Sequence, residues 1–253
     1  WPRISQKLRQ AGRVMLLFDY DGTLTPIVDR PDLALMAPET RALLAGLSRD
    51  ERFLLGIISG RRIDDIRSRV GVEGLVYAGN HGVEIQGPGF DFTHPAADEL
   101  RDTQRRVYAR LREKLADAPG VILEDKGLTL SLHYRLTPEE HVGNVEELFA
   151  ATIAPFLEEG QLKVFRGKKV LEVRPAGHWN KGTAITKIRE TYGRSAMTVF
   201  FGDDVTDEDG FAVVQEEDGI AVLVGPAGQP TQALYRVDSP EEVVDTLKLL
   251  TQL

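Results

Sequence analysis

Short apolar runs recur in the first and last thirds of the chain, and each of them ends at a polar residue or a glycine. The five runs are residues 14–18, 53–58, 75–78, 198–201 and 220–224. Runs this short that are apolar at every position are typical of parallel strands with helices on both faces. Residues 40–47 and 63–70, between the runs, carry apolar side chains at helical spacing. The pattern predicts a Rossmann-like, doubly wound α/β sheet that binds ligands beyond the carboxyl ends of its strands.

The middle of the chain departs from this alternation of strand and helix. Its pattern predicts, in order, a strand, a long helix, two alternating strands, a second helix and a closing strand, at about residues 84, 100–115, 121–126, 128–136, 138 onward and 168–174. Consecutive strands indicate a separate α+β unit inserted into the first domain. We therefore expect a core domain of residues 1–83 and 176–253, with residues 84–175 forming an inserted cap domain.

Composition limits the function classes. The 253 residues include 31 Lys and Arg against 39 Asp and Glu, a formal net charge of −8, so no basic footprint for nucleic acid or an anionic membrane is expected. The absence of cysteine excludes disulfides, zinc–thiolate sites and thiol nucleophiles. No apolar run approaches the ~18 residues of a membrane helix. We expect a soluble, cytoplasmic, monomeric protein, which would need local cations or a metal to hold an anionic ligand.

Two carboxylates follow the first strand run, in the sequence Asp19-Tyr20-Asp21-Gly22-Thr23. In an extended chain, residues two apart point the same way, so Asp19 and Asp21 would face one site. Such a pair suits a nucleophile, a general acid or base, or a ligand for a hard cation. Asp and Gly are also common in the turns that end strands, so a purely structural role stays open.

Two predicted helix starts carry residues that suit an anion. Ser59-Gly60 follows the second run, and its hydroxyl and free amides could bind an anion, although Ser is also a common N-cap. Asn180 is a ready N-cap for the helix after residue 180, but Lys181 in the first turn opposes the helix dipole. A bound anion would explain that lysine, and a solvated side chain is the alternative.

An acidic cluster, Gly202-Asp203-Asp204-Val205-Thr206-Asp207-Glu208-Asp209, follows the fourth run. Thr206 and Asp209 are spaced as a capping box, which leaves Asp203 and Asp204 at the strand end without a capping role. Acids from two strand ends, a hydroxyl from a third and a lysine from a helix start should meet at one edge of the sheet. Such a site needs a divalent cation and an anion, and a phosphoryl group fits.

This order of motifs resembles the haloacid dehalogenase superfamily of phosphohydrolases over nearly the whole chain. Within it, seven segments resemble the trehalose-6-phosphate phosphatase family: Asp19-Tyr20-Asp21-Gly22-Thr23-Leu24, Ser59-Gly60-Arg61, Gly79-Asn80-His81-Gly82, Leu132-His133-Tyr134-Arg135, Glu172-Val173-Arg174-Pro175, Asn180-Lys181-Gly182 and residues 202–208. The resemblance implies a phosphatase that acts on trehalose 6-phosphate in the last step of trehalose synthesis, with a sugar phosphate as its partner molecule.

The resemblance also implies roles for individual residues. Asp19 would be the nucleophile that forms an aspartyl-phosphate and Asp21 the general acid and base, while Ser59 and Lys181 would hold the phosphoryl oxygens. Mg²⁺ would be bound by Asp19, the Asp21 carbonyl and Asp203, supported by Asp204 and Asp207. The predicted substrate-binding residues are Gly60, Arg61, Asn80, His81, Glu124, Lys126, His133, Arg135 and Glu172.

Two alternatives stay open at this point. A related sugar phosphatase, acting on sucrose phosphate, mannosyl-phosphoglycerate or a monosaccharide phosphate, would use the same core chemistry with different cap contacts. A non-catalytic sugar-phosphate-binding module would have no use for both acids of the Asp19–Asp21 pair.

Overall fold

The chain divides into two compact units in the structure, a computed structural model that describes residues 2–176 and 179–253. The core unit comprises Trp1–Phe92 and Trp179–Leu253, and the inserted unit comprises Thr93–His178. The predicted boundary after residue 83 is nine residues too early. Strands β4 (Glu84–Gly87) and β5 (Phe90–Thr93) continue the core sheet, because β4 pairs antiparallel with the strand before it.

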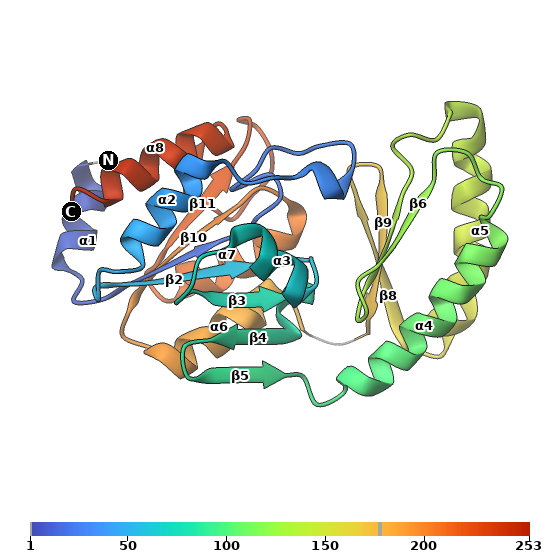
Figure 1. Cartoon of the computed structure of the whole chain (residues 1–253), viewed down its shortest axis with the longest axis horizontal. Helices are drawn as coiled ribbons and strands as arrows, with labels where there is room; N and C mark the ends of the chain where they lie inside the picture. The colour runs from blue at the N-terminus through green and yellow to red at the C-terminus, as the bar shows by residue number, and fades with distance from the viewer. Residues whose placement is uncertain (1, 177–178) are drawn as a thin grey trace. The chain divides into compact units, whose positions relative to one another are not determined.

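An eight-stranded sheet forms the centre of the core unit, in the order β12-β11-β10-β1-β2-β3-β4-β5 (Figure 1). Its other strands are β1 (Val14–Phe18), β2 (Phe53–Ile58), β3 (Val76–Gly79), β10 (Met197–Gly202), β11 (Ile220–Val224) and β12 (Tyr235–Val237). The strands from β12 to β3 pair in parallel. The five strands and the doubly wound α/β class predicted from the apolar runs are confirmed. The edge strand β12 was not predicted, since it is mostly exposed and has no apolar run.

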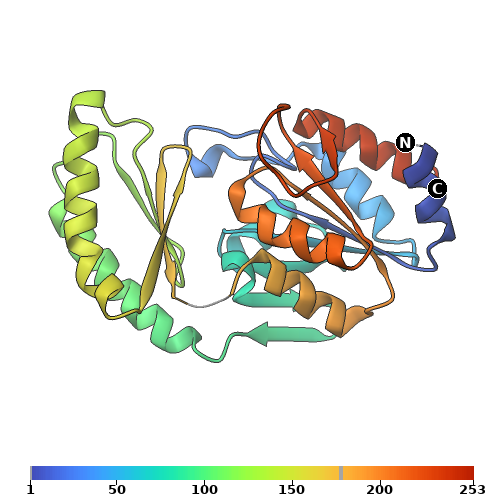
Figure 2. The same ribbon diagram turned by 180° about the vertical axis from the view of Figure 1, so that it is seen from behind.

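Helices cover both faces of this sheet, as Figures 1 and 2 show from opposite sides. One face packs on α1 (Pro2–Gln10), α2 (Pro38–Leu47), α3 (Ile63–Val70) and α8 (Pro240–Leu250), and the other on α6 (Lys181–Tyr192) and α7 (Glu208–Glu216). Strand β1 supplies Leu16 and Phe18 to the first core and Met15 and Leu17 to the second. Burial on both faces therefore explains why the run is apolar at every position. No helix in the described ranges is long and apolar enough to cross a membrane.

The register of the central strands determines where the polar residues emerge. Phe18 at the end of β1 lies beside Phe201 of β10 and Ile57 of β2. The Asp19 N–H continues the pattern by donating to the Phe201 carbonyl at 2.8 Å. The residues that follow β1, β2 and β10 consequently leave the sheet at the same edge, as predicted for parallel strands.

The inserted unit has a four-stranded antiparallel sheet, ordered β6-β7-β9-β8, and two long helices (Figure 2). Its elements are α4 (Ala97–Lys114), β6 (Ile122–Asp125), β7 (Leu130–His133), α5 (Glu139–Glu158), β8 (Leu162–Gly167) and β9 (Val170–Pro175). The two helices and one face of the sheet form a third apolar core. Strand β8 was not predicted, because two of its six residues are cationic and three are exposed.

Candidate active site

Lys181 is buried at the centre of a cluster of acidic side chains. It is the first residue of α6, whose N-cap Asn180 forms a reciprocal capping box with Thr183. The Lys181 side chain is only 3% exposed, and its Nζ donates to Asp19 Oδ1 at 2.7 Å and to Asp207 Oδ1 at 2.6 Å. The alternative of a solvated lysine is therefore wrong. Two protein carboxylates offset the unfavourable placement of this cation at a helix N-terminus.

Asp203 joins this cluster from the end of β10. Its carboxylate lies against the backbone of Gly22, where φ is +90° and a Cβ atom would collide with the Asp203 side chain, so only glycine permits the approach. Carboxylate oxygens of Asp19, Asp203 and Asp207 lie within 4.8 Å of one another. Asp203 Oδ1 is buried and accepts no hydrogen bond from any described residue. An orphaned carboxylate oxygen beside two other carboxylates is an arrangement that suits a cation.

The cluster holds more negative charge than Lys181 can balance. Burial, together with the neighbouring Asp19 and Asp207 carboxylates, raises the pKa of Asp203 to about 9. Burial likewise raises the pKa of Asp19 to about 7, against the opposing effect of Lys181. For Lys181, burial acts to lower the pKa, but Asp19 and Asp207 outweigh it and the pKa is raised. Since the donors are hard oxygens and the excess charge is negative, the residues fit a Mg²⁺ ion.

These shifts predict an unusual pH dependence of stability. Folded Asp203 holds its proton up to a pKa of about 9, whereas the unfolded chain releases it near the ordinary value of 3.8. Between these values the folded state binds more protons, so we expect this carboxyl group to lower the free energy of unfolding of the metal-free protein as pH rises. Mg²⁺ should raise the melting temperature more at pH 8.5 than at pH 5.5, because it binds the ionised carboxylates.

Thermal unfolding with EDTA or with Mg²⁺ at both pH values measures this effect. The Asp203→Asn variant keeps all other titrating groups and is therefore the control. Its Mg²⁺-induced increases in melting temperature at pH 5.5 and pH 8.5 should differ less than those of the wild type. If Mg²⁺ raises the melting temperature of the wild type equally at both pH values, the assignment of Asp203 to the Mg²⁺ site is contradicted.

The acidic loop after β10 is organised differently from the sequence prediction. Asp204, not Thr206, is the N-cap, and it precedes a short 3₁₀ helix, Val205–Asp207. Asp207 completes the capping box: its Oδ2 accepts the N–H groups of Asp203 at 3.1 Å and Asp204 at 3.0 Å. The view that Asp204 has no capping role is therefore wrong. Asp207, which is fully buried, connects this loop to Lys181.

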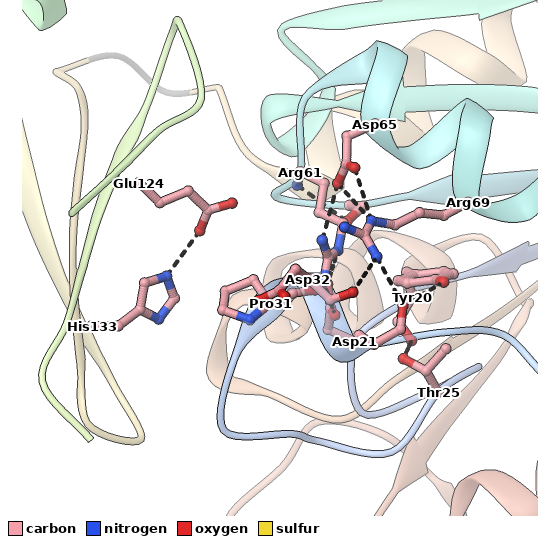
Figure 3. Close-up of polar contacts among 12 residues, drawn as sticks. Tyr20, Asp21, Thr25, Pro31, Asp32, Arg61, Asp65, Arg69, Glu124 and His133 are labelled. Atoms are coloured by element: carbon pink, nitrogen blue, oxygen red, sulfur yellow. Dashed lines mark hydrogen bonds and ion pairs between the residues drawn. The ribbon is translucent and has the colours of Figure 1, made fainter. Parts of the chain in front are cut away.

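Asp21 has a different partner from Asp19. The extended chain assumed for the pair ends with β1 at Phe18, and the Asp21 carboxylate pairs with Arg61. Arg61 Nη2 donates to Asp21 Oδ1 at 2.6 Å and Arg61 Nε donates to Asp21 Oδ2 at 2.7 Å, as Figure 3 shows. Arg61 also donates to the Pro31 carbonyl and to Asp65, so protein atoms accept four of its five N–H bonds. This geometry disfavours the predicted substrate-binding role of Arg61.

Ser59 lies at the end of β2 and is almost fully buried. Helix α3 begins only at Ile63 and has Arg62 as its N-cap, so the alternative that Ser59 simply caps this helix is wrong. Its Oγ accepts the Arg61 N–H at 3.2 Å. An oxygen that accepts one hydrogen bond keeps its own O–H available as a donor.

The segment after β3 packs on the Ser59 loop. The His81 N–H donates to the Ser59 carbonyl at 2.9 Å, and a Cβ atom on Gly60 would lie 2.7 Å from the His81 ring. Asn80 and His81 both have positive φ angles, 49° and 57°, which non-glycine residues rarely adopt. The structure thus places the predicted residues Asn80 and His81 beside Gly60, in a strained turn of the kind found at functional sites.

Four of the five predicted residues of the inserted unit form one polar cluster. His133 Nε2 lies 2.8 Å from Glu124 Oε2 (Figure 3), and Lys126 Nζ lies 3.9 Å from Glu124 and 3.6 Å from Glu172. The alternating strand pattern brings these side chains to one face of the antiparallel sheet. All four are partly or largely shielded from solvent.

Arg135 and Arg174 depart from the prediction for this cluster. Arg135 follows β7, is exposed and donates to the Lys168 carbonyl at 2.9 Å, a hydrogen bond that lies outside the cluster. Arg174 was not predicted as a site residue, yet it is buried, donates to Glu172 Oε2 at 2.6 Å and stacks over the Phe165 ring. The signal that could have identified it was its shared strand face with Glu172, two residues earlier.

The parallel sheet, the inserted unit and the charged residues at the strand ends together define the haloacid dehalogenase fold. A haloacid dehalogenase-like hydrolase from Bacteroides thetaiotaomicron has the same fold, with a TM-score of 0.59 and 18% identity over 94% of this chain and 99% of its own. The trehalose-phosphatase family model matches residues 17–241, and the chain belongs to this family.

Two more similar proteins carry the family name. A probable trehalose-phosphate phosphatase 4 from Oryza sativa is 36% identical over 249 residues, which are 95% of this chain and 66% of the rice protein. The C-terminal domain of Candida albicans trehalose-6-phosphate phosphatase is 28% identical, with a TM-score of 0.86 over 100% of this chain and 96% of that domain. This chain thus spans about two thirds of the rice relative but nearly all of the fungal domain.

Proposed function

We propose that the chain hydrolyses the phosphate ester of trehalose 6-phosphate to trehalose and inorganic phosphate, the last step of trehalose synthesis. The observation that carries the proposal is the buried cluster of Asp19, Lys181, Asp207 and Asp203 at the carboxyl edge of the sheet. Membership of the trehalose-phosphatase family supports it. The cytoplasmic location and the monomeric state stay predictions.

The first half of the reaction transfers the phosphoryl group to the protein. An Asp19 carboxylate oxygen attacks phosphorus, the bond from phosphorus to the sugar oxygen breaks, and Asp21 gives that oxygen a proton. In the second half, water attacks phosphorus, its proton goes to Asp21, and the bond to Asp19 breaks. The Ser59 hydroxyl and the Lys181 ammonium donate to the phosphoryl oxygens, where negative charge is spread in the transition state.

The carboxylates of Asp19 and Asp203 and the backbone carbonyl of Asp21 would hold Mg²⁺. When bound, the ion supplies positive charge that offsets these carboxylates and the phosphoryl group. The buried, unpartnered oxygen of Asp203 and the raised pKa values of Asp203 and Asp19 support this assignment.

We assign recognition of the sugar to the polar cluster of the inserted unit. Glu124 and Glu172 can accept hydrogen bonds from sugar hydroxyls, while Lys126 can donate them. The Glu124→Gln variant keeps the size but removes the charge, and we expect it to raise KM for trehalose 6-phosphate about tenfold, which equals ~1.4 kcal/mol of lost binding. Its effect on p-nitrophenyl phosphate, which lacks a sugar, should be smaller than twofold.

Arg166→Ala is the matched control for that variant. Arg166 lies on β8 of the same sheet, is largely exposed and pairs with Glu146, outside the cluster. Steady-state phosphate release with both substrates gives the comparison. A Glu124→Gln enzyme with an unchanged KM for the sugar phosphate would remove this residue from the proposed sugar site.

A panel of phosphate esters tests the substrate itself. With Mg²⁺, trehalose 6-phosphate should give a higher kcat/KM than sucrose 6-phosphate, mannosyl-3-phosphoglycerate or glucose 6-phosphate. Removal of the metal with EDTA should abolish phosphate release. Faster turnover of another sugar phosphate would assign the chain to that substrate instead. Saturable binding of trehalose 6-phosphate with no phosphate release would indicate a non-catalytic binding module.

A further inference from the structure

We propose that Asp65 is a positioning residue for this reaction, which holds the Arg61 guanidinium in place and through it sets the carboxylate of Asp21. The proposal rests on the proposed function, because it takes Asp21 to be the group that protonates the sugar oxygen. Asp65 lies in the first turn of α3 and belongs to none of the motifs that identify the family in the sequence.

Asp65 joins two arginines that flank it in the sequence. Its Oδ2 accepts from Arg61 Nη1 at 3.0 Å, and its two oxygens accept from Arg69 Nε at 2.8 Å and 2.9 Å. Both arginines are four residues away: Arg69 lies on α3 at the separation at which helical side chains meet, and Arg61 precedes the N-cap of that helix. Arg69 is anchored in turn by the Ala34 carbonyl, which its Nη1 reaches at 3.1 Å.

Arg61 is held from several sides, as Figure 3 shows. Its Nε and Nη2 bind both oxygens of Asp21, its Nη1 binds Asp65, and Nη2 also donates to the Pro31 carbonyl at 2.9 Å. The guanidinium carbon lies 5.4 Å from the centre of the Tyr20 ring. The planar guanidinium group is hydrogen-bonded along two edges and lies over the Tyr20 ring, so it has one orientation. That orientation determines where the Asp21 carboxylate lies.

Asp65 also has an electrostatic role, as a counter-ion for the Arg61 guanidinium. The Arg61 side chain is only 5% exposed, whereas the Asp21 side chain is 42% exposed. When the Asp21 carboxylate turns from Arg61 towards a substrate, a buried guanidinium would lose its main counter-ion, which is costly in a site shielded from water. Asp65 keeps Arg61 paired during that step, so Asp21 can leave and return to the same position.

The test compares leaving groups that do and do not need a proton. The Asp65→Asn variant should lower kcat/KM for trehalose 6-phosphate about 30-fold, but that for p-nitrophenyl phosphate by less than threefold. The parameter kcat/KM includes only the steps up to release of the leaving group, and p-nitrophenolate leaves without a general acid. A merely structural role would lower both values by the same factor.

Matched variants complete the experiment. Asp64→Asn removes an exposed acid from the same helical turn and should leave both kcat/KM values unchanged. Adding Asp65→Asn to Asp21→Asn should cost no further activity, because the positioning acts through Asp21. Arg61→Lys keeps the charge but lacks the planar fork that binds both Asp21 oxygens and Asp65 at once, so it should show the same selective loss. It is the variant to measure if Asp65→Asn folds poorly.

An equal loss on both substrates, an additive loss in the double variant, or full activity of Asp65→Asn would each overturn the role of Asp65. Failure of the proposed function looks different, since the wild type would then release no phosphate from trehalose 6-phosphate. If the panel favours another sugar phosphate, that compound replaces trehalose 6-phosphate in the comparison.

Discussion

Asp19→Asn is expected to lower kcat for sugar phosphate hydrolysis by about 10⁴-fold or more, which corresponds to a barrier raised by at least ~5.5 kcal/mol. The Asp19 carboxylate accepts a hydrogen bond from Lys181 at 2.7 Å, and an amide oxygen in its place cannot form the aspartyl-phosphate on which both half-reactions depend. Phosphate release under saturating trehalose 6-phosphate and Mg²⁺ measures the loss. Because no covalent intermediate forms, p-nitrophenyl phosphate should be affected equally.

The substitution should leave the fold intact. The Asn side-chain oxygen can still accept the Lys181 hydrogen bond, and Lys181 keeps the Asp207 carboxylate as its counter-ion. Since burial raises the pKa of Asp19 to about 7, removing this carboxyl group should not lower the melting temperature of the metal-free protein at pH 8. Asp64→Asn, at an exposed position, is the control for the general effect of losing one negative charge. Near-normal turnover by Asp19→Asn would exclude the nucleophile role.

The sequence predicted the core of the fold because burial leaves a strong signal. The residues of β1 are buried on alternate faces in two separate apolar cores, so every position must be apolar. The same signal is absent from β8 and β12, whose side chains are largely exposed, and these strands were missed. The domain boundary was misplaced for a related reason, since β4 turns back antiparallel on the core sheet and alternation cannot say which sheet a strand joins.

The core of the site could also be anticipated, because parallel strands that end in register bring Asp19, Ser59 and Asp203 to one edge. A lysine at the positive end of a helix was a second signal, and the structure explains it by two buried carboxylates. The partners of individual side chains were beyond such reasoning. Arg61 is 40 residues from Asp21, and only the path of the loop after β2 determines that they pair.

The largest expected loss of stability comes from replacing Lys181 by Met, which removes the charge at nearly constant length. Asp207 would keep the two backbone N–H bonds from Asp203 and Asp204 but lose the Lys181 ammonium that pairs with it, while it remains fully buried. Breaking a buried ion pair from one side typically costs ~3–5 kcal/mol. We expect this loss in urea unfolding at pH 8, together with loss of phosphate release, because the phosphoryl oxygens lose their ammonium donor.

The double variant Lys181→Met, Asp207→Asn separates the two effects. The Asn oxygen can still accept the N–H bonds of Asp203 and Asp204 and carries no charge, so the part of the lost stability that arises from the Asp207 carboxylate should return, while Asp19 stays without its Lys181 partner. Turnover should not return, because the Lys181 ammonium that donates to the phosphoryl oxygens is missing. If Asp207→Asn does not restore stability to the Lys181→Met background, the cost does not arise from an uncompensated Asp207 carboxylate. If turnover returns with stability, Lys181 acts only through the fold, and the phosphoryl oxygens must be held by other groups.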